Sequence, residues 1–233
     1  MYFKNRSHAG WLLAKKVLLV EIDKSNTVVL AISNGGVPVA IEIARELNLE
    51  IDIALINKIR IPSNSNLVIG AVSEENESFL NLDYMSYFNY SKIEIEQFKL
   101  QALKELELES KSIRNKRLPF LLENKEVILV DDGIETGATV GVAIQLMKKM
   151  KVAKIVVVVP VASPEMIKKI KNQVDKIITV VAPQFVNSID NWYEDFDQVE
   201  NEEVLKVLSD YSTVRQYREN KNLILKIQNS STF

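Results

Sequence analysis

The chain has 233 residues, of which 47% are hydrophobic, and its 29 Lys and Arg side chains against 31 Asp and Glu leave a formal net charge of -2. This length and apolar content are sufficient for one sizeable core, while the near-neutral charge argues against a nucleic-acid-binding surface. The absence of cysteine excludes disulfides and thiolate metal sites, and the single histidine, His8, excludes a histidine-rich zinc site, so any catalysis must rest on carboxylates, a metal ion or backbone dipoles.

The N-terminal segment predicts no signal peptide, and no segment predicts a membrane anchor. Residues 1–17 lack the long apolar stretch of a secretory signal. The longest apolar run, residues 155–162, is too short to cross a bilayer. We therefore expect a cytoplasmic protein that contacts no membrane and no nucleic acid.

Short apolar runs alternate with stretches of helical period, which predicts an α/β fold whose strands are connected by crossover helices. Strands are expected at residues 28–32, 51–56, 68–72, 127–130, 155–159 and 177–181. Helices are expected around residues 40–47 and 140–147, where apolar residues recur at i, i+3, i+4 and i+7, at the charged segment 91–116 and at 201–208. The charge of the segment 91–116 favours a surface helix or a dimer-facing arm.

Neither an internal repeat nor a clear linker divides the chain. We therefore expect one domain over residues 1–208 and a C-terminal extension, residues 209–233, whose sequence mixes polar residues with one apolar stretch. The extension is consistent with a packed segment, a dimer contact or a partly disordered end.

The first segment with chemical character is AISNGGVP, residues 31–38, directly after the first strong strand. Two adjacent glycines between a strand and a helix allow the backbone to approach a ligand closely and to adopt positive φ. An ordinary strand-to-helix turn would have the same composition. The position of the segment before the first crossover favours a ligand-binding loop.

The most informative segment is VILVDDGIETGATV, residues 127–140. An uninterrupted apolar run of this length is typical of a strand buried on both faces of a parallel sheet, so Asp131 and Asp132 should stand at its carboxyl end, where open α/β sheets place their ligands. The following TGAT, residues 136–139, offers amides and hydroxyls at a helix N-terminus, which suits a phosphate. Carboxylates for hydroxyls or a metal beside an anion cradle indicate a phosphorylated sugar.

This segment resembles the ribose-phosphate signature of the type I phosphoribosyltransferases (PRTases), in which two acids and a T-G-x-T loop follow a hydrophobic strand. The start of the chain, F-x-N-R-x-x-A-G-x-x-L-A, resembles a subgroup of small bacterial and archaeal proteins with this domain. The residues that carry this second likeness are Phe3, Asn5, Arg6, Ala9, Gly10, Leu13 and Ala14. The resemblance extends over about residues 3–208. It implies an open, mostly parallel twisted sheet with helices on both faces and a small hood, formed by about residues 182–197 and the N-terminal segment.

The resemblance also assigns roles in the acidic segment. Asp131 and Asp132 are expected to hold the ribose 2′- and 3′-hydroxyls, often through Mg²⁺, and are thus the candidate metal ligands and catalytic acids. The residues expected to hold the ribose 5′-phosphate are Glu135, Thr136, Gly137, Ala138 and Thr139. Glu135 occupies the place of an acid near the base in purine-using relatives, so it is also expected to exchange a proton with the base.

The pyrophosphate-binding loop of the family corresponds to Ser33, Asn34, Gly35 and Gly36, with Lys58 as a further candidate. Three asparagines depart from the family pattern: Asn34 stands where an Arg is usual, Asn57 replaces half of an Arg-Lys pair, and Asn66 replaces an acid. Arg60 is a weaker candidate for the missing charge, since a solvated loop cation is an equal reading. By the same resemblance, Phe185 and Trp192 are candidates for stacking on the base.

The resemblance implies a Mg²⁺-dependent transfer of 5-phosphoribosyl from 5-phosphoribosyl 1-diphosphate (PRPP) to a nitrogenous base, in particular a purine, with release of pyrophosphate. Its expected partners are PRPP, a nucleobase or nucleotide, and a second copy of the chain in a homodimer. Two alternatives stay open. Asn34 and Asn57 fit a binding or regulatory protein without turnover, and the loop would hold the phosphate of a nucleoside monophosphate equally well.

Overall fold

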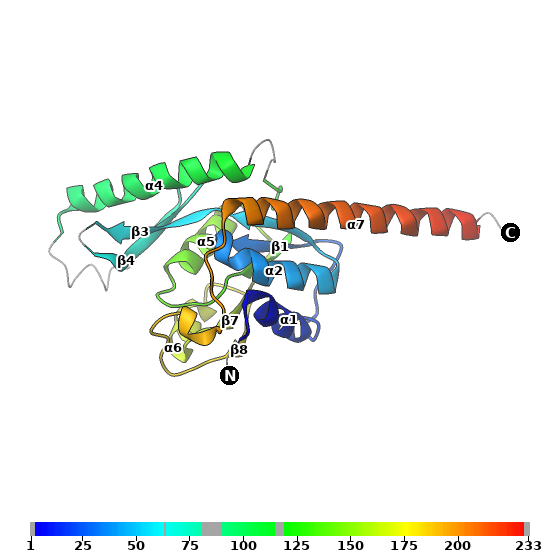
Figure 1. Cartoon of the computed structure of the whole chain (residues 1–233), viewed down its shortest axis with the longest axis horizontal. Coiled ribbons are helices and arrows are strands. Elements are labelled where there is room, and N and C mark those ends of the chain that lie inside the picture. Colours follow the sequence, from blue (N-terminus) through cyan, green and yellow to red (C-terminus); the bar gives the residue numbers. More distant parts are fainter. Residues whose placement is uncertain (1–2, 63, 81–89, 115–118, 231–233) are drawn as a thin grey trace.

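The computed structural model describes residues 3–62, 64–80, 90–114 and 119–230. A five-stranded parallel sheet in the order β2-β1-β6-β7-β8 forms the centre of the molecule (Figure 1). Its strands are β1 (Thr27–Ile32), β2 (Glu50–Ala54), β6 (Glu126–Val130), β7 (Lys154–Val161) and β8 (Lys176–Val181). All neighbouring pairs are parallel, so the predicted α/β architecture with a mostly parallel sheet is confirmed.

Both faces of the sheet are buried, which explains why its strands are continuous apolar runs. Because successive side chains of a strand point to opposite faces, β6 contributes to two separate apolar clusters. Ile128 and Val130 lie in one cluster with α1 (Arg6–Val17) and α2 (Ser33–Leu47). Val127 and Leu129 lie in the other, with α5 (Ala138–Lys149) and α6 (Pro164–Lys171). The helices predicted at residues 40–47 and 140–147 are thus confirmed.

A second, antiparallel sheet consists of β3 (Ile56–Ile61), β4 (Asn64–Ser73) and β5 (Ser78–Leu80). The strand predicted at residues 51–56 is wrong in its C-terminal bound, because β2 ends at Ala54 and β3 begins at Ile56. The strand predicted at 68–72 exists, but it belongs to this second sheet. Only residues 62 and 63 lie between β3 and β4, so the two strands can pair only as an antiparallel hairpin.

The predicted charged helix is α4 (Lys92–Arg114), which contacts β3 and β4 and forms an arm with them (Figure 1). Four of its residues are buried, and most of the others face solvent, in agreement with a surface helix. Arg114, in its last turn, pairs with Asp52 of β2 and with Glu74. These contacts fasten the arm to the parallel sheet.

The terminal helix α7 runs from Asn201 to Ser230, so it continues well past the predicted end at residue 208. Its first turns pack on the domain: Tyr211 is buried and its hydroxyl lies 2.8 and 2.7 Å from the carbonyl oxygens of Ala44 and Leu49. Beyond this anchor the helix projects away from the sheet (Figure 1).

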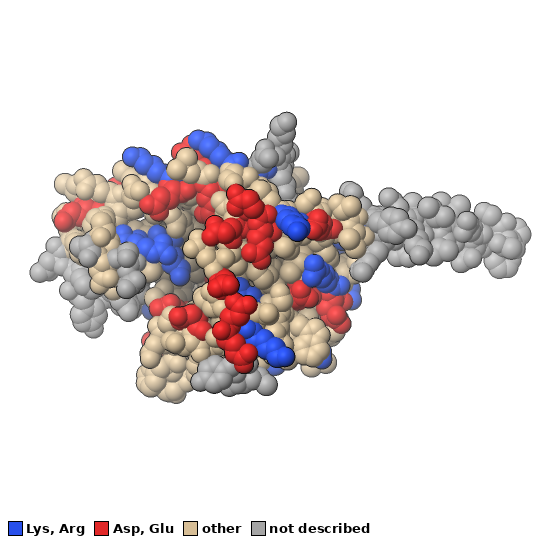
Figure 2. Space-filling view, in the orientation of Figure 1, with Lys and Arg blue, Asp and Glu red and all other residues tan. Residues whose placement is uncertain are grey.

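The described surface carries both signs of charge. On the face shown in Figure 2, acidic side chains form clusters and basic side chains are interspersed among them, so no extended basic surface appears there. None of the helices that the structure describes is both long enough and apolar enough to span a membrane.

Candidate active site

The carboxyl ends of β1 and β6 meet at one edge of the parallel sheet, because the strands pair in register with Ala31 opposite Val130. The segments that follow them, residues 33–36 and 131–137, therefore start side by side. A cavity of about 490 Å³ lies between these segments, β3 and residues 196–199. Ligands of open α/β sheets bind at this edge, and most of the residues singled out from the sequence line the cavity.

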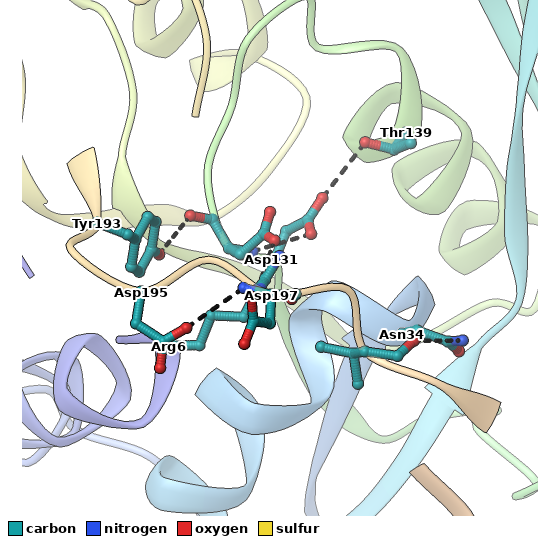
Figure 3. Close-up of polar contacts among 9 residues, drawn as sticks. Arg6, Asn34, Asp131, Thr139, Tyr193, Asp195 and Asp197 are labelled. Carbon is teal, nitrogen blue, oxygen red and sulfur yellow. Dashed lines mark hydrogen bonds and ion pairs between the residues drawn. The ribbon is translucent and has the colours of Figure 1, made fainter. Parts of the chain in front are cut away.

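Asp131 is the more deeply placed of the two acids, with 8% of its surface exposed. Its Oδ1 accepts the amide of Asp132 at 2.9 Å and its Oδ2 accepts the Thr139 hydroxyl at 3.3 Å (Figure 3). Burial raises the pKa of Asp131 well above the usual value, and the charge of Asp132 raises it further, while Lys58 opposes both effects. Such a carboxylate gains free energy from a ligand that supplies a cation or a donor.

Asp132 is held from two sides. Its Oδ2 lies 2.9 Å from Nε of Arg6, and its backbone carbonyl accepts the Tyr193 hydroxyl at 2.7 Å (Figure 3). Burial and the charge of Asp132 raise the pKa of that hydroxyl, which therefore remains a donor. A Cβ at Gly35 would lie 2.6 Å from Asp132 Oδ2, so only glycine permits this approach between the two predicted loops.

The phosphate loop predicted at residues 135–139 has the expected form. Gly137 has φ 75°, a conformation that favours glycine, and α5 begins at the next residue. Within the described residues, the amides of Glu135, Thr136, Gly137 and Thr139 have no protein acceptor, and that of Ala138 makes a long contact of 3.4 Å to the Thr136 hydroxyl. All but Ala138 line the cavity, since the methyl group of Ala138 is part of the core. Free amides at a helix start can bind an anion.

The loop after β1 differs from the expectation in its backbone. The positive φ falls on Ser33, at 52°, and neither glycine adopts one. The Ser33 hydroxyl donates to the Ile56 carbonyl at 2.6 Å, which stabilises this turn. Gly36 is buried, and a Cβ there would lie 2.6 Å from the carbonyl oxygen of Val130. The glycines therefore serve close packing against the end of β6, and of the pair only Gly35 lines the cavity.

The two asparagines that replace family cations have partners within the protein. Asn34 donates to Asn201 Oδ1 at 2.7 Å and to the Val199 carbonyl at 3.2 Å, which ties the loop to the start of α7 (Figure 3). Its Oδ1 is buried without a hydrogen-bond partner. Asn57 donates to Glu105 of α4 at 3.1 Å. Both side chains line the cavity, yet their amide groups serve packing between elements.

The remaining charged residues of the cavity come from the arm. Lys58 and Arg60, on β3, both line it, and Lys58 is close enough to lower the pKa of Asp131. Glu109 of α4 also lines it, and burial together with the charge of Glu74 raises its pKa. Nothing in the sequence distinguishes Glu109 from the other acids of this helix.

The structure does not bring Phe185 or Trp192 to the cavity. Phe185 is 75% exposed, and Trp192 packs in a small cluster with Phe3, whose amide donates to the Trp192 carbonyl. This pairing holds Trp192 against the N-terminal segment. Ile189 and Phe196, from the same stretch of the chain, line the cavity instead.

Arg6 has no role in the sequence-based prediction, although it belongs to the opening motif. Besides its ion pair with Asp132, it donates from Nη1 to the Asp197 carbonyl at 2.7 Å, and its guanidinium carbon lies 3.6 Å from the centre of the Phe196 ring. The side chain is 11% exposed. Only packing brings this residue beside an acid 126 positions away.

The model of the phosphoribosyl transferase domain matches residues 8–196. The chain belongs to this family. Two Mycobacterium tuberculosis proteins that are provisionally named phosphoribosyl transferases, MT0597 and Rv0571c, are 28% identical to it over 206 residues, which is 88% of this chain and 46% of theirs. The chain thus spans about half the length of these curated relatives. The crystal structure of TT1426 from Thermus thermophilus is 32% identical, covers 91% of this chain and 99% of its own, and superposes with a TM-score of 0.73.

The matched part of this phosphoribosyl transferase domain contains the acidic pair and both loops, whereas Arg6 and α7 lie outside it. The described residues contain no group of three or more side chains of the kinds that hold metals. Among the described residues that line the cavity, Asp131 and Asp132 offer a divalent cation two adjacent carboxylates. This set fits Mg²⁺, which is commonly held by one or two carboxylates together with substrate phosphates.

Proposed function

We propose that this phosphoribosyl transferase domain catalyses Mg²⁺-dependent transfer of 5-phosphoribosyl from PRPP to a nitrogenous base, with purine as the preferred class, and releases pyrophosphate. One observation carries the proposal. Asp131 and Asp132 stand between the free amides of the loop 135–139 and the loop 33–35, and all three face one cavity. This order matches a ribose ring, on which the diol lies between the 5′-phosphate and the diphosphate.

The proposed reaction requires the protein mainly to position the substrate and to neutralise charge. Displacement at the ribose C1 passes through a transition state with oxocarbenium character, for which a fixed sugar phosphate, a neutralised leaving group and exclusion of water are sufficient. The loop 135–139 would fix the phosphate, and Mg²⁺ on the acidic pair would orient the diphosphate and the diol. Lys58 would add positive charge near Asp131.

The buried state of Asp131 supports a ligand at this position. In the free protein the carboxylate receives one amide and one long hydroxyl contact, which leaves the burial of its charge only partly compensated. A sugar hydroxyl or Mg²⁺ would compensate it. Binding of the substrate would thus offset the unfavourable free energy of burying the Asp131 charge.

Glu135 supports a purine as the acceptor. It is exposed and lines the mouth of the cavity beside the phosphate loop, where it can exchange a proton with a ring nitrogen. We expect Glu135→Gln to lower kcat by about 100-fold, the usual range for a general acid or base, with little change in PRPP affinity. Steady-state kinetics would measure kcat, and a direct binding experiment would measure the affinity for PRPP. Equal loss of kcat and affinity, or loss of neither, would exclude this role.

The direct test mixes the protein with Mg²⁺, PRPP and a panel of free purines and pyrimidines, and follows pyrophosphate and nucleotide by chromatography. Asp131→Asn and Asp132→Asn serve as matched controls, because each removes one charge from the acidic pair at nearly constant volume. Nucleotide formation by the wild type and its loss in both variants support the transferase. Binding of PRPP without product from any base contradicts it.

A specific observation favours a second candidate, a regulatory protein that binds PRPP or a nucleotide without turnover. Asn34 and Asn57 direct their amide groups to other elements of the protein instead of neutralising a diphosphate. Such a protein would be stabilised against unfolding by the ligand, yet would release no pyrophosphate. The reaction assay above separates the two candidates.

A further inference from the structure

The loop after β1 has no cation of its own. Residues 33–36 read Ser-Asn-Gly-Gly, and the amide group of Asn34 is committed to Asn201 and the Val199 carbonyl. A departing diphosphate gains negative charge, which must be neutralised where it develops. If this loop receives the diphosphate, any positive side chain that contacts it has to come from another element.

Arg6 of α1 occupies the required place. Its Nε contacts Asp132 and its Nη1 contacts the Asp197 carbonyl, whereas its Nη2 has no acceptor among the described residues. Nη2 is also the atom that would lie 3.8 Å from a Cβ at Gly35. Nη2 of this largely buried guanidinium therefore lies beside Gly35 with its N–H groups available to a ligand.

The guanidinium is held in place before any ligand binds. It stacks on the Phe196 ring at 3.6 Å and is fixed at its edges by Asp132 and Asp197. A guanidinium carries five N–H donors, so it can contact a carboxylate and a phosphate oxygen at the same time. Binding of a diphosphate would thus leave the pair with Asp132 intact.

We propose that Arg6 binds the diphosphate of PRPP, and the released pyrophosphate, in place of a cation on the loop after β1. This inference rests on the proposed function, since it concerns the same site. It assigns a binding residue that lies outside the matched family region. If Arg6 only positioned Asp132, it would support binding of the ribose diol instead. Its loss would then weaken the binding of every ribose ligand alike.

The test compares two ligands that contain a diphosphate, PRPP and pyrophosphate, with one that has the ribose and the 5′-phosphate but no diphosphate. Dissociation constants of PRPP, inorganic pyrophosphate and ribose 5-phosphate are measured by calorimetry with Mg²⁺ for the wild type, Arg6→Gln and Arg6→Lys. Arg45→Gln is the matched control, because Arg45 is half exposed and pairs with Glu42 on its own helix. We expect Arg6→Gln to weaken PRPP and pyrophosphate by roughly 10- to 100-fold and ribose 5-phosphate by less than about twofold.

Arg6→Lys keeps the charge without the planar donor fork, and we expect an intermediate loss restricted to the two diphosphate ligands. Should Arg6→Gln fail to fold, Arg6→Lys provides the test. If its ratio of pyrophosphate affinity to ribose 5-phosphate affinity equals that of the wild type, the inference is overturned. Parallel loss of all three ligands in Arg6→Gln, or loss of none, also overturns it. A wild type that binds ribose 5-phosphate but neither diphosphate ligand overturns the proposed function itself, and this inference with it.

Discussion

Asp131 shows at the scale of one residue how the site costs stability. A carboxylate that is 8% exposed lies next to a second acid at the end of a strand, and burial and like charge both raise its pKa. Groups of this kind are common where a fold sacrifices stability for ligand binding. This loss of folding stability should be measurable in the protein without any ligand.

We expect Asp131→Asn to unfold at a higher temperature than the wild type at neutral pH. Because folding raises the pKa of Asp131, the wild type loses stability as the pH rises from the unfolded value of about 3.9 through the folded value, while the asparagine variant does not. The difference should therefore shrink below about pH 4. Thermal melts across this acidic range and up to neutral pH measure it, with the exposed Asp210→Asn as control. A variant less stable at neutral pH would contradict the expectation.

Gly35 permits a different test at the residue scale. Its backbone is helical, so alanine introduces no backbone strain, but the new Cβ would lie 2.6 Å from Asp132 Oδ2 and would displace that carboxylate. We expect Gly35→Ala to weaken PRPP binding by about tenfold or more, one broken charged contact, and to change the free energy of unfolding by less than about 1 kcal/mol.

Gly141→Ala is the matched control for this variant. Gly141 lies on α5 and does not line the cavity, and its new Cβ would lie 3.2 Å from the Phe79 ring of β5. We expect unchanged PRPP affinity, measured by calorimetry alongside Gly35→Ala. Equal affinities of the two variants would show that the contact between Gly35 and Asp132 has no importance for binding.

At the scale of elements, the arm of α4, β3 and β4 determines one wall of the cavity. Lys58 and Arg60 come from β3 and Glu109 from α4, so their placement depends on how the arm is fastened to the parallel sheet. Arg114 provides the fastening: it pairs with Asp52 at 3.1 Å and with Glu74, and donates to the Ile53 carbonyl at 2.7 Å.

We expect Arg114→Met to lower the free energy of unfolding by about 3–5 kcal/mol, because it removes the guanidinium that pairs with the Asp52 carboxylate, which is 2% exposed, and with Glu74. Lys111→Met, on the same helix, removes a surface pair with Glu107 and should cost less than about 1 kcal/mol. Urea denaturation of both variants measures the difference. Similar values for the two would show that Arg114 does not fasten the arm.

At the scale of the whole molecule, the cavity joins the parallel sheet, the arm, the N-terminal helix and the segment before α7. A ligand bound there contacts elements from most of the chain, so it should stabilise the domain as a unit. Both candidate functions share this consequence, and it tests the site itself.

We expect PRPP with Mg²⁺ at about 100 times its dissociation constant to stabilise the folded state by about 2.7 kcal/mol. For a chain of this size that corresponds to a rise in melting temperature of roughly 5–10 °C. Differential scanning fluorimetry measures it, with ribose as a control that lacks both phosphate groups. No shift at saturating PRPP would exclude the assignment of this cavity.

The sequence by itself determined the features that depend on neighbouring residues. The buried strand 127–130, the acids at its end and the turn into α5 follow from an apolar run, two carboxylates and a glycine within one short segment. The alternation of apolar runs and helical periods likewise predicted the parallel sheet and the helix 91–116. Local patterns of this kind predict where a functional segment lies because backbone geometry repeats over a few residues.

Only the tertiary structure decided which side chains meet in the cavity. The pair of Arg6 with Asp132, the commitment of Asn34 to Asn201 and the placement of Phe196 instead of Trp192 join segments far apart in the chain. Such contacts depend on the packing of whole elements, and a side chain's partner across the fold leaves no periodic trace in the sequence. The strand split at residue 55 has the same origin, since the hairpin of β3 and β4 turns an apolar run into two sheets.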